Sequence, residues 1–81
     1  MNNHNNGKPR KNQHIQLQLC KRMRDLREDN DLKQWQLAKM LKIDRSTYAH
    51  YERGRTQPDL EMIMKLANYY SVSVDYLLGN D

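Results

Sequence analysis

The segment from Leu32 to Gly54 constrains the fold of this 81-residue chain more than any other part of it. Apolar side chains recur there at helical spacing in two short runs, which predict amphipathic helices over residues 34–41 and 45–53. Only Lys42-Ile43 and an N-cap residue separate the two runs, so the connection is a tight turn. Two helices joined in this way pack against each other, which makes the segment the centre of the predicted fold.

The helix predicted over residues 45–53 has a clear signal at each end. Asp44 precedes it, and its carboxylate can accept the free backbone N–H groups of the first turn. Gly54 follows it and can adopt the left-handed conformation that ends many helices. Tyr48 and Tyr51 suggest base stacking, but their spacing turns them inward, so we expect them in the core.

Polar side chains with hydrogen-bonding reach occupy the other face of this helix. Arg45 can donate two hydrogen bonds to guanine O6 and N7, although a phosphate contact or a solvated side chain fits it as well. His50 can contact a base or a phosphate, or stay without a partner, and the small Ser46 suits either contact. Thr47 fits packing or a phosphate better than a base. The pattern predicts that this helix enters the major groove of double-stranded DNA.

Three further helices complete the predicted fold, and no segment shows the alternation of a strand. The first starts near Ile15 and ends in the polar run at residues 28–31, with an apolar stripe of Ile15, Leu19, Met23 and Leu26. Asp59 caps the fourth helix, whose predicted stripe is Leu60, Ile63, Met64, Ala67 and Tyr70. Ser73 caps a short fifth helix, which contributes Val74, Leu77 and Leu78. The predicted fold class is all-α, a bundle of five helices.

The first fourteen residues differ in composition from the remainder. They are rich in Asn and basic side chains and hold almost nothing apolar, so we predict a disordered basic tail over residues 1–14 and one domain over residues 15–79. The tail can serve as a basic arm that wraps the duplex, or it is a leader without a binding role.

Composition excludes several classes of function. The single cysteine, Cys20, allows no intrachain disulfide and suits a reducing cytoplasm, and we expect it to pack on a helix face. No apolar run approaches the ~20 residues of a membrane span. The chain shows no acid–base pair, nucleophile constellation or phosphate loop, and its histidines are scattered. We therefore expect no enzyme, no metal site and no cofactor.

The net charge of +4 is unevenly distributed. Residues 33–55 hold six basic side chains against two acidic ones, whereas residues 56–81 hold one basic side chain against four acidic ones. Positive charge therefore gathers on the segment predicted to bind DNA, as expected for a surface that attracts a polyanion.

From about Leu19 to Leu78 the chain resembles the phage-repressor-like helix-turn-helix family (Cro/CI-type, XRE). The resemblance rests on several spaced signals in order: Met23-x-x-Leu26-Arg27, Leu32-x-Gln34-x-x-Leu37-Ala38, Ile43-x-x-Ser46-x-x-x-x-Tyr51-Glu52-x-Gly54, Pro58-x-Leu60 and Val72-Ser73-Val74-Asp75-x-Leu77-Leu78. It implies a five-helix bundle of the lambda-repressor-like type. It also implies a bacterial or phage regulator, a repressor in the first instance, that binds a palindromic operator as a two-fold dimer.

The resemblance also implies roles for individual residues. The positions that read base edges hold Arg45, Ser46 and His50. The position that contacts a phosphate and braces the third helix holds Gln34, and the loop that approaches the backbone holds Arg53, Gly54 and Arg55. The positions of an internal salt bridge hold Arg27 and Glu52.

Two lysines depart from the family pattern. Lys33 stands where Ser or Thr usually caps the second helix, and Lys42 stands where the turn favours glycine. We expect both to contact the DNA backbone, at some cost in local stability; simple tolerance of the two lysines is the alternative.

Trp35 stands where relatives usually have a polar residue. It packs on a neighbouring side chain or contacts another protein, and the sequence does not separate these readings. The second reading supports an alternative function, a protein-interaction module such as an antitoxin or the partner of an anti-repressor.

Overall fold

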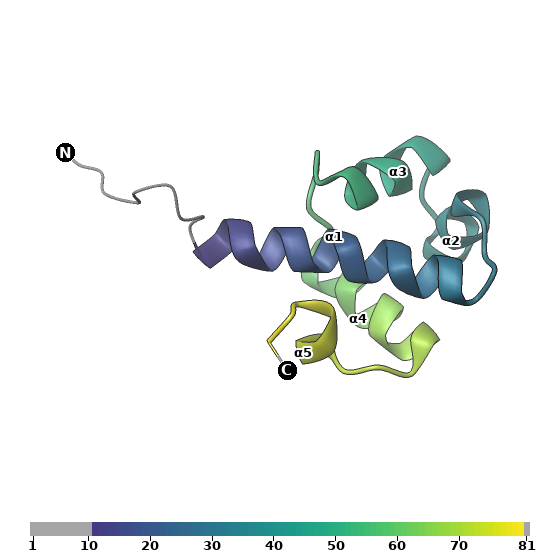
Figure 1. The fold of residues 1–81 in the computed structure, drawn as a ribbon. Helices are drawn as coiled ribbons and strands as arrows, with labels where there is room; N and C mark the ends of the chain where they lie inside the picture. Colours follow the sequence, from purple (N-terminus) through teal and green to yellow (C-terminus); the bar gives the residue numbers. More distant parts are fainter. Residues whose placement is uncertain (1–10, 81) are drawn as a thin grey trace.

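The computed structural model describes residues 11–80, which form five helices and no strand (Figure 1). This confirms the predicted all-α fold of five helices. No helix in this range is long and apolar enough to cross a membrane. The helices are α1 (Lys11–Asp29), α2 (Gln34–Leu41), α3 (Arg45–Arg53), α4 (Leu60–Tyr70) and α5 (Val74–Leu77).

The long helix α1 is the scaffold on which the other helices pack. In Figure 1 it crosses the molecule, with α3 on one side and α4 and α5 on the other. Helix α3 packs against both α2 and α1, and α5 packs against α1 and α4. The pair α2–α3 is therefore held at one side of α1, with one face of α3 turned away from the bundle.

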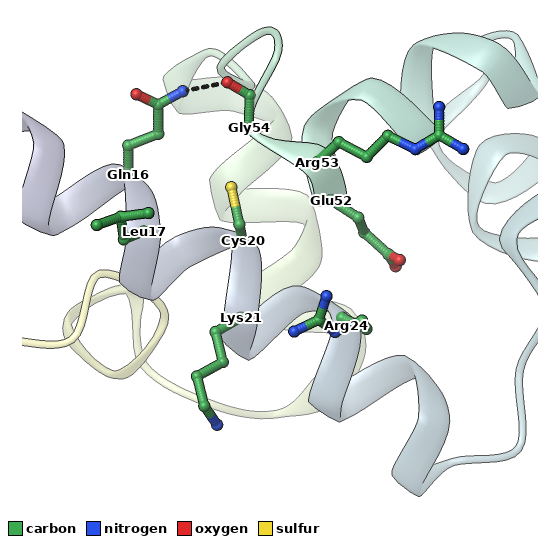
Figure 2. A pocket seen from close by; sticks show the side chains of 8 residues that line it. All are labelled: Gln16, Leu17, Cys20, Lys21, Arg24, Glu52, Arg53 and Gly54. Atoms are coloured by element: carbon green, nitrogen blue, oxygen red, sulfur yellow. Dashed lines mark hydrogen bonds between the residues drawn. The ribbon is translucent and has the colours of Figure 1, made fainter.

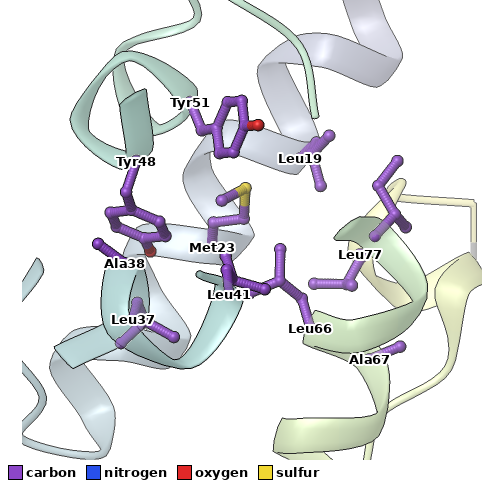
Figure 3. Packing of buried hydrophobic residues seen from close by; sticks show 11 residues of the cluster. Leu19, Met23, Leu37, Ala38, Leu41, Tyr48, Tyr51, Leu66, Ala67 and Leu77 are labelled. Carbon is purple, nitrogen blue, oxygen red and sulfur yellow. The ribbon is translucent and has the colours of Figure 1, made fainter. Parts of the chain in front are cut away.

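The core lies where the five helices meet, and every helix contributes to it (Figure 3). Burial of these apolar side chains supplies most of the stability of such a domain. Tyr48 is fully buried, and its ring meets that of Tyr51 edge to face at 6.4 Å between centroids. Both tyrosines therefore anchor α3 in the core, as predicted. The side chains with less than 2% exposure are Tyr48, Leu19, Met23, Leu37, Leu41, Leu66 and Leu77.

The predicted start of the first helix is wrong. Helix α1 begins at Lys11 rather than near Ile15, so residues 11–14 are helical and not part of a disordered tail. The rest of the predicted tail, residues 1–10, lies outside the described residues. The first turn of α1 is polar, so no apolar stripe in the sequence marked the start of this helix.

The predicted face of α4 is also rotated. Leu60 and Met64 are 65% and 51% exposed, whereas Leu66, which the prediction omitted, is fully buried. Ile63 and Ala67 are buried as predicted. Because α4 carries apolar residues around more than half of its circumference, its sequence fits two overlapping stripes, and only contact with α5 and the core decides between them.

The predicted caps of α4 and α5 are present, but the predicted cap of α3 is not. Asp59 accepts from the backbone N–H of Met62 at 2.9 Å, and Ser73 accepts from that of Tyr76 at 2.9 Å. Asp44 has the extended backbone of an N-cap residue, yet its side chain makes no capping hydrogen bond. Asp44 is exposed instead.

Each of the five helices ends in the same way, with a left-handed residue directly or shortly after its last turn. The two N–H groups there donate back into the helix, which satisfies carbonyl groups that would otherwise be unpaired. Glycine suits this conformation best, because it lacks the Cβ that crowds the backbone. The left-handed residues are Asp31, Lys42, Gly54, Ser71 and Gly79.

Candidate nucleic-acid interface

A buried carboxylate, that of Glu52 on α3, organises the surroundings of this helix. Glu52 is 6% exposed. Arg27 from α1 donates through Nε to Oε2 at 2.7 Å and through Nη2 to Oε1 at 3.1 Å. The hydroxyl of Tyr48 donates to Oε2 at 2.5 Å, and Gln34 Nε2 donates to Oε1 at 3.2 Å. We call Arg27, Gln34, Tyr48 and Glu52 the Glu52 cluster.

The Glu52 cluster ties three helices together at one point. Arg27 comes from α1, Gln34 from the first position of α2, and Tyr48 and Glu52 from α3. Arg27 also donates through Nη1 to the carbonyl of Leu32, in the linker before α2, at 2.9 Å. The Arg27–Glu52 salt bridge that the family resemblance implied is thus present, and it fixes how α3 lies against the bundle.

The Tyr48 hydroxyl is a member of the cluster that the sequence analysis missed. The signal was available, because residues four apart on a helix share a face, and Tyr48 precedes Glu52 by four positions. The helical spacing of Tyr48 predicted that its ring lies in the core, which is correct. It did not predict the hydrogen bond that its hydroxyl donates to Glu52.

The cluster holds Glu52 in its charged form. Burial by itself would raise the pKa of Glu52, but the hydrogen bonds from Arg27, Tyr48 and Gln34 outweigh it and hold this pKa below its ordinary value. The pKa of Tyr48 is raised, first by burial and then by its hydrogen bond to the carboxylate. The pKa of Arg27 is raised, first by its hydrogen bond to Glu52. Glu52 therefore remains an acceptor of all three donors at neutral pH.

The outer face of α3 carries the residues expected to read bases. At about 100° per residue, Ser46, His50 and Arg53 point away from the buried side chains of Tyr48, Tyr51 and Glu52. Arg45, Ser46 and Arg53 are exposed, and His50 is half-buried. Thr47 lies at the edge of the face and is half-buried. The structure thus brings the predicted base-contact residues Ser46 and His50 onto one face, whereas Arg45 is exposed at the start of α3, at the edge of that face.

Exposed cations lie at the ends of α2 and α3. Lys33, immediately before α2, and Lys42, immediately after it, are both exposed. Lys33 has the backbone of an N-cap residue and its N–H donates to Gln36 Oε1 at 2.7 Å, but its ammonium group cannot accept a capping hydrogen bond. Lys42 has a φ of 61°, the left-handed conformation that the family pattern implies for this position.

The loop after α3 is held by α1. Gln16 Nε2 donates to the carbonyl oxygen of Gly54 at 2.8 Å, and Cys20 Sγ donates to the carbonyl oxygen of Tyr51 at 3.1 Å. Figure 2 shows both side chains reaching from α1 toward the end of α3. Gly54 has a φ of 75°, and a Cβ added there would lie 3.3 Å from Cys20 Sγ. Cys20 therefore packs between helices, as predicted, and burial raises the pKa of its thiol.

An open hollow of about 450 Å³ lies between α1 and the end of α3 (Figure 2). Of the predicted DNA-contact residues, only Arg53 and Gly54 line it, so it is a separate feature from the outer face of α3. Gln16, which also lines this hollow, was not among the predicted site residues. No local pattern could have found this residue, since its partner is 38 positions away.

Comparison with known proteins agrees with this geometry. The model of the helix-turn-helix family matches residues 23–77. The HTH-type transcriptional regulator ImmR of Bacillus subtilis is 38% identical over 65 residues, which cover 80% of this chain and 51% of the relative. The cryptic phage CTXphi transcriptional repressor RstR of Vibrio cholerae is 37% identical over 73% of this chain and 53% of the relative. The chain spans about half the length of the curated relatives it matches.

A solved structure shares the arrangement of the helices. A transcriptional regulator from Listeria innocua superposes with a TM-score of 0.73 and 34% identity, covering 75% of this chain and 57% of that one. The matched family segment runs from α1 to the end of α5 and contains the whole Glu52 cluster. The chain therefore belongs to the helix-turn-helix family, which confirms the resemblance to phage-repressor-like proteins seen in its sequence.

Proposed function

We propose that this chain is the DNA-binding part of a transcriptional regulator, acting as a repressor that occupies an operator. Helix α3 enters the major groove, where Arg45, Ser46 and His50 contact base edges. The protein performs no chemistry on the DNA and acts by competing for promoter sites or by recruitment. Its relatives are bacterial and phage regulators, which favours action in a bacterial cytoplasm.

The observation that carries this proposal is the way α3 is held. Its inner face is fixed by Tyr48, Tyr51 and the Glu52 cluster, while its outer face stays accessible. Base readout needs side chains held within a fraction of an ångström of the base edges, so a helix that reads DNA must be rigid from behind.

The backbone contacts follow from the surface around α3. Exposed cations precede and follow α2 and follow α3, and cations of this kind neutralise phosphates on both sides of a groove. Gln34 donates its amide to Glu52 and is the first residue of α2. The free backbone N–H groups at this end of a helix favour a phosphate. The proposed backbone contacts are Lys33, Gln34, Lys42, Thr47, Arg53, Gly54 and Arg55.

We propose that two copies bind a palindromic operator. A single module of this size buries about 600–1,000 Å² of protein surface on DNA, which is small for a tight specific complex. Two copies double the contact and place half-sites ~34 Å apart, one turn of the duplex. The proposed dimer surface is the segment 72–78, which contains α5.

Selection from a library of random duplexes tests the proposal. We expect the wild-type protein to enrich a palindrome with half-sites one turn apart. Arg45→Ala should weaken binding to the enriched duplex by about tenfold to a hundredfold and relax the choice at one base pair of each half-site.

Lys65→Ala is the matched control, since it removes one positive charge from α4, away from the proposed contacts. It should leave affinity and sequence choice unchanged. Failure of the wild-type protein to enrich any sequence would contradict the proposal. A loss with Arg45→Ala that is equal on all sequences would move Arg45 from base contact to phosphate contact.

A further inference from the structure

We propose that Gln16 and Cys20 of α1 are positioning residues for DNA binding, which hold the loop Arg53–Gly54–Arg55 against the phosphate backbone. The inference rests on the proposed function and extends it to a part of α1 that carries none of the expected contacts.

The first observation is where the two side chains donate. Gln16 reaches the carbonyl of Gly54 at 2.8 Å, and Cys20 reaches the carbonyl of Tyr51 at 3.1 Å. Both acceptors belong to the end of α3 and the residue that follows it, and the carbonyl of Tyr51 also accepts from the N–H of Gly54 at 3.2 Å. Two successive turns of α1 therefore hold the same end of the recognition helix.

The second observation concerns the peptide group between Gly54 and Arg55. Its carbonyl oxygen accepts from Gln16, and its N–H donates to the carbonyl of His50 at 2.9 Å. Because a peptide group is planar, bonds at both of its ends fix its orientation. The position of the Arg55 Cα atom, from which this side chain leaves the loop, is then fixed as well.

The third observation is the close approach that Gly54 permits. Its left-handed φ of 75° disfavours any other residue, and an added Cβ would lie 3.3 Å from Cys20 Sγ and 3.8 Å from Gln16 Nε2. Helix α1 thus meets the loop at its most conformationally restricted point. The loop is exposed on its other side, where Arg53 and Arg55 face solvent.

Without the contact from Gln16, the peptide group loses one of its two anchors. The loop then samples more orientations, and Arg55 is ordered only when DNA binds. That ordering cost appears in the affinity for DNA. Gln16 lies at the edge of the bundle and is half-buried, so its loss leaves the core and the Glu52 cluster in place.

The test uses Gln16→Met, which keeps the length of the side chain and removes its donor. The probes are the duplex enriched by the wild-type protein and a scrambled duplex of the same composition, with affinity measured across a range of salt concentrations. We expect affinity for both probes to fall about threefold to tenfold. We also expect the slope of log affinity against log salt to stay unchanged, because Arg55 still reaches its phosphate once the DNA is bound.

Gln18→Met is the matched control on the same helix. Gln18 packs against Gly79 beside α5 and not against the loop, so this variant should bind DNA as the wild type does. Cys20→Ala should add to the effect of Gln16→Met, whereas Cys20→Ser, which keeps a donor, should restore part of it.

A double-mutant cycle with Arg55→Ala distinguishes positioning from a general loss of stability. If Gln16 acts through the loop, Gln16→Met should have little further effect on binding once Arg55 is removed. Equal effects in both backgrounds would overturn the inference while leaving the proposed function intact. If the wild-type protein binds neither probe, both proposals are overturned.

Discussion

The buried carboxylate of Glu52 receives three donors, and this arrangement links the stability of single residues to pH. Its pKa in the folded state lies below the ordinary value of 4.5. A lowered pKa contributes stability that is complete above pH 4.5 and is lost as the pH falls through the folded value. We therefore expect the free energy of unfolding, measured with urea, to decline below pH 4.5.

Glu52→Gln should remove this part of the acid dependence. It should also cost about 3 kcal/mol at pH 7, since the side chain of Arg27 is only 14% exposed and would lose its counter-charge. Asp25→Asn is the matched control. Its pKa is also lowered, by the hydrogen bond from Lys21, but the ion pair is exposed and screened by salt. If Glu52→Gln keeps the acid dependence of the wild type, another carboxylate controls it.

The buried hydroxyls of Tyr48 and Tyr70 differ in whether they have a hydrogen-bond partner, and substitution by phenylalanine measures what that difference contributes to stability. The hydroxyl of Tyr48 donates to Glu52, whereas the buried hydroxyl of Tyr70 has no hydrogen-bond partner among the described residues. Tyr48→Phe should lower the free energy of unfolding by about 1.5–3 kcal/mol, the worth of a hydrogen bond to a charged group. Tyr70→Phe should leave it unchanged or raise it by up to about 1 kcal/mol, because an unpaired buried oxygen is removed. Destabilisation by Tyr70→Phe would show that its hydroxyl is bonded in solution.

At the level of the helices, local signals decided how well the sequence predicted the structure. Helices α2 and α3 have the predicted bounds, because a short turn and a following glycine fix their ends. The start of α1 and the buried face of α4 were wrong for opposite reasons. The first turns of α1 carry too little apolar pattern, and α4 carries too much, so Leu60 was expected in the core and Leu66 was omitted.

The two unusual lysines at the ends of α2 give a prediction for this helix. Lys42→Gly should raise the free energy of unfolding by about 1 kcal/mol, because glycine adopts a φ of 61° without strain. Lys33→Thr should add a similar amount by supplying the acceptor that an N-cap needs. Chemical denaturation of the single and double variants measures both effects.

Lys42→Ala separates charge from strain. It removes the ammonium group but keeps a Cβ in the left-handed conformation, so it should not stabilise the fold. If these two lysines destabilise α2 but bind phosphates, Lys42→Gly and Lys42→Ala should weaken DNA binding equally, because both remove the same ammonium group. A Lys33→Thr, Lys42→Gly double variant that is more stable and binds DNA as well as the wild type would contradict this role of the lysines.

In the whole molecule, the candidate site is built from contacts that cross long stretches of chain. The family resemblance implied the Arg27–Glu52 pair, and the pattern of polar residues predicted an outer face of α3 with Arg45, Ser46 and His50. Neither could reveal that Gln16 holds Gly54, since that contact depends on how α1 lies against the end of α3. The residues proposed to face DNA could thus be named from local pattern and resemblance, whereas the contact of Gln16 with Gly54 could not.

The salt dependence of DNA binding measures how many of the proposed phosphate contacts form in the complex. Four cations, Lys33, Lys42, Arg53 and Arg55, are proposed to neutralise phosphates in each copy. At about −0.9 per phosphate, the slope of log affinity against log salt should be roughly −3.6 for one copy and twice that for two copies on a palindrome. Fluorescence anisotropy between 50 and 300 mM salt, about the range over which such complexes weaken strongly, gives this slope directly. Arg55→Ala should reduce it by about 0.9 per copy, and Lys65→Ala should not change it. A slope near zero would contradict docking of α3 in the groove, because no route to the bases avoids the phosphates on either side.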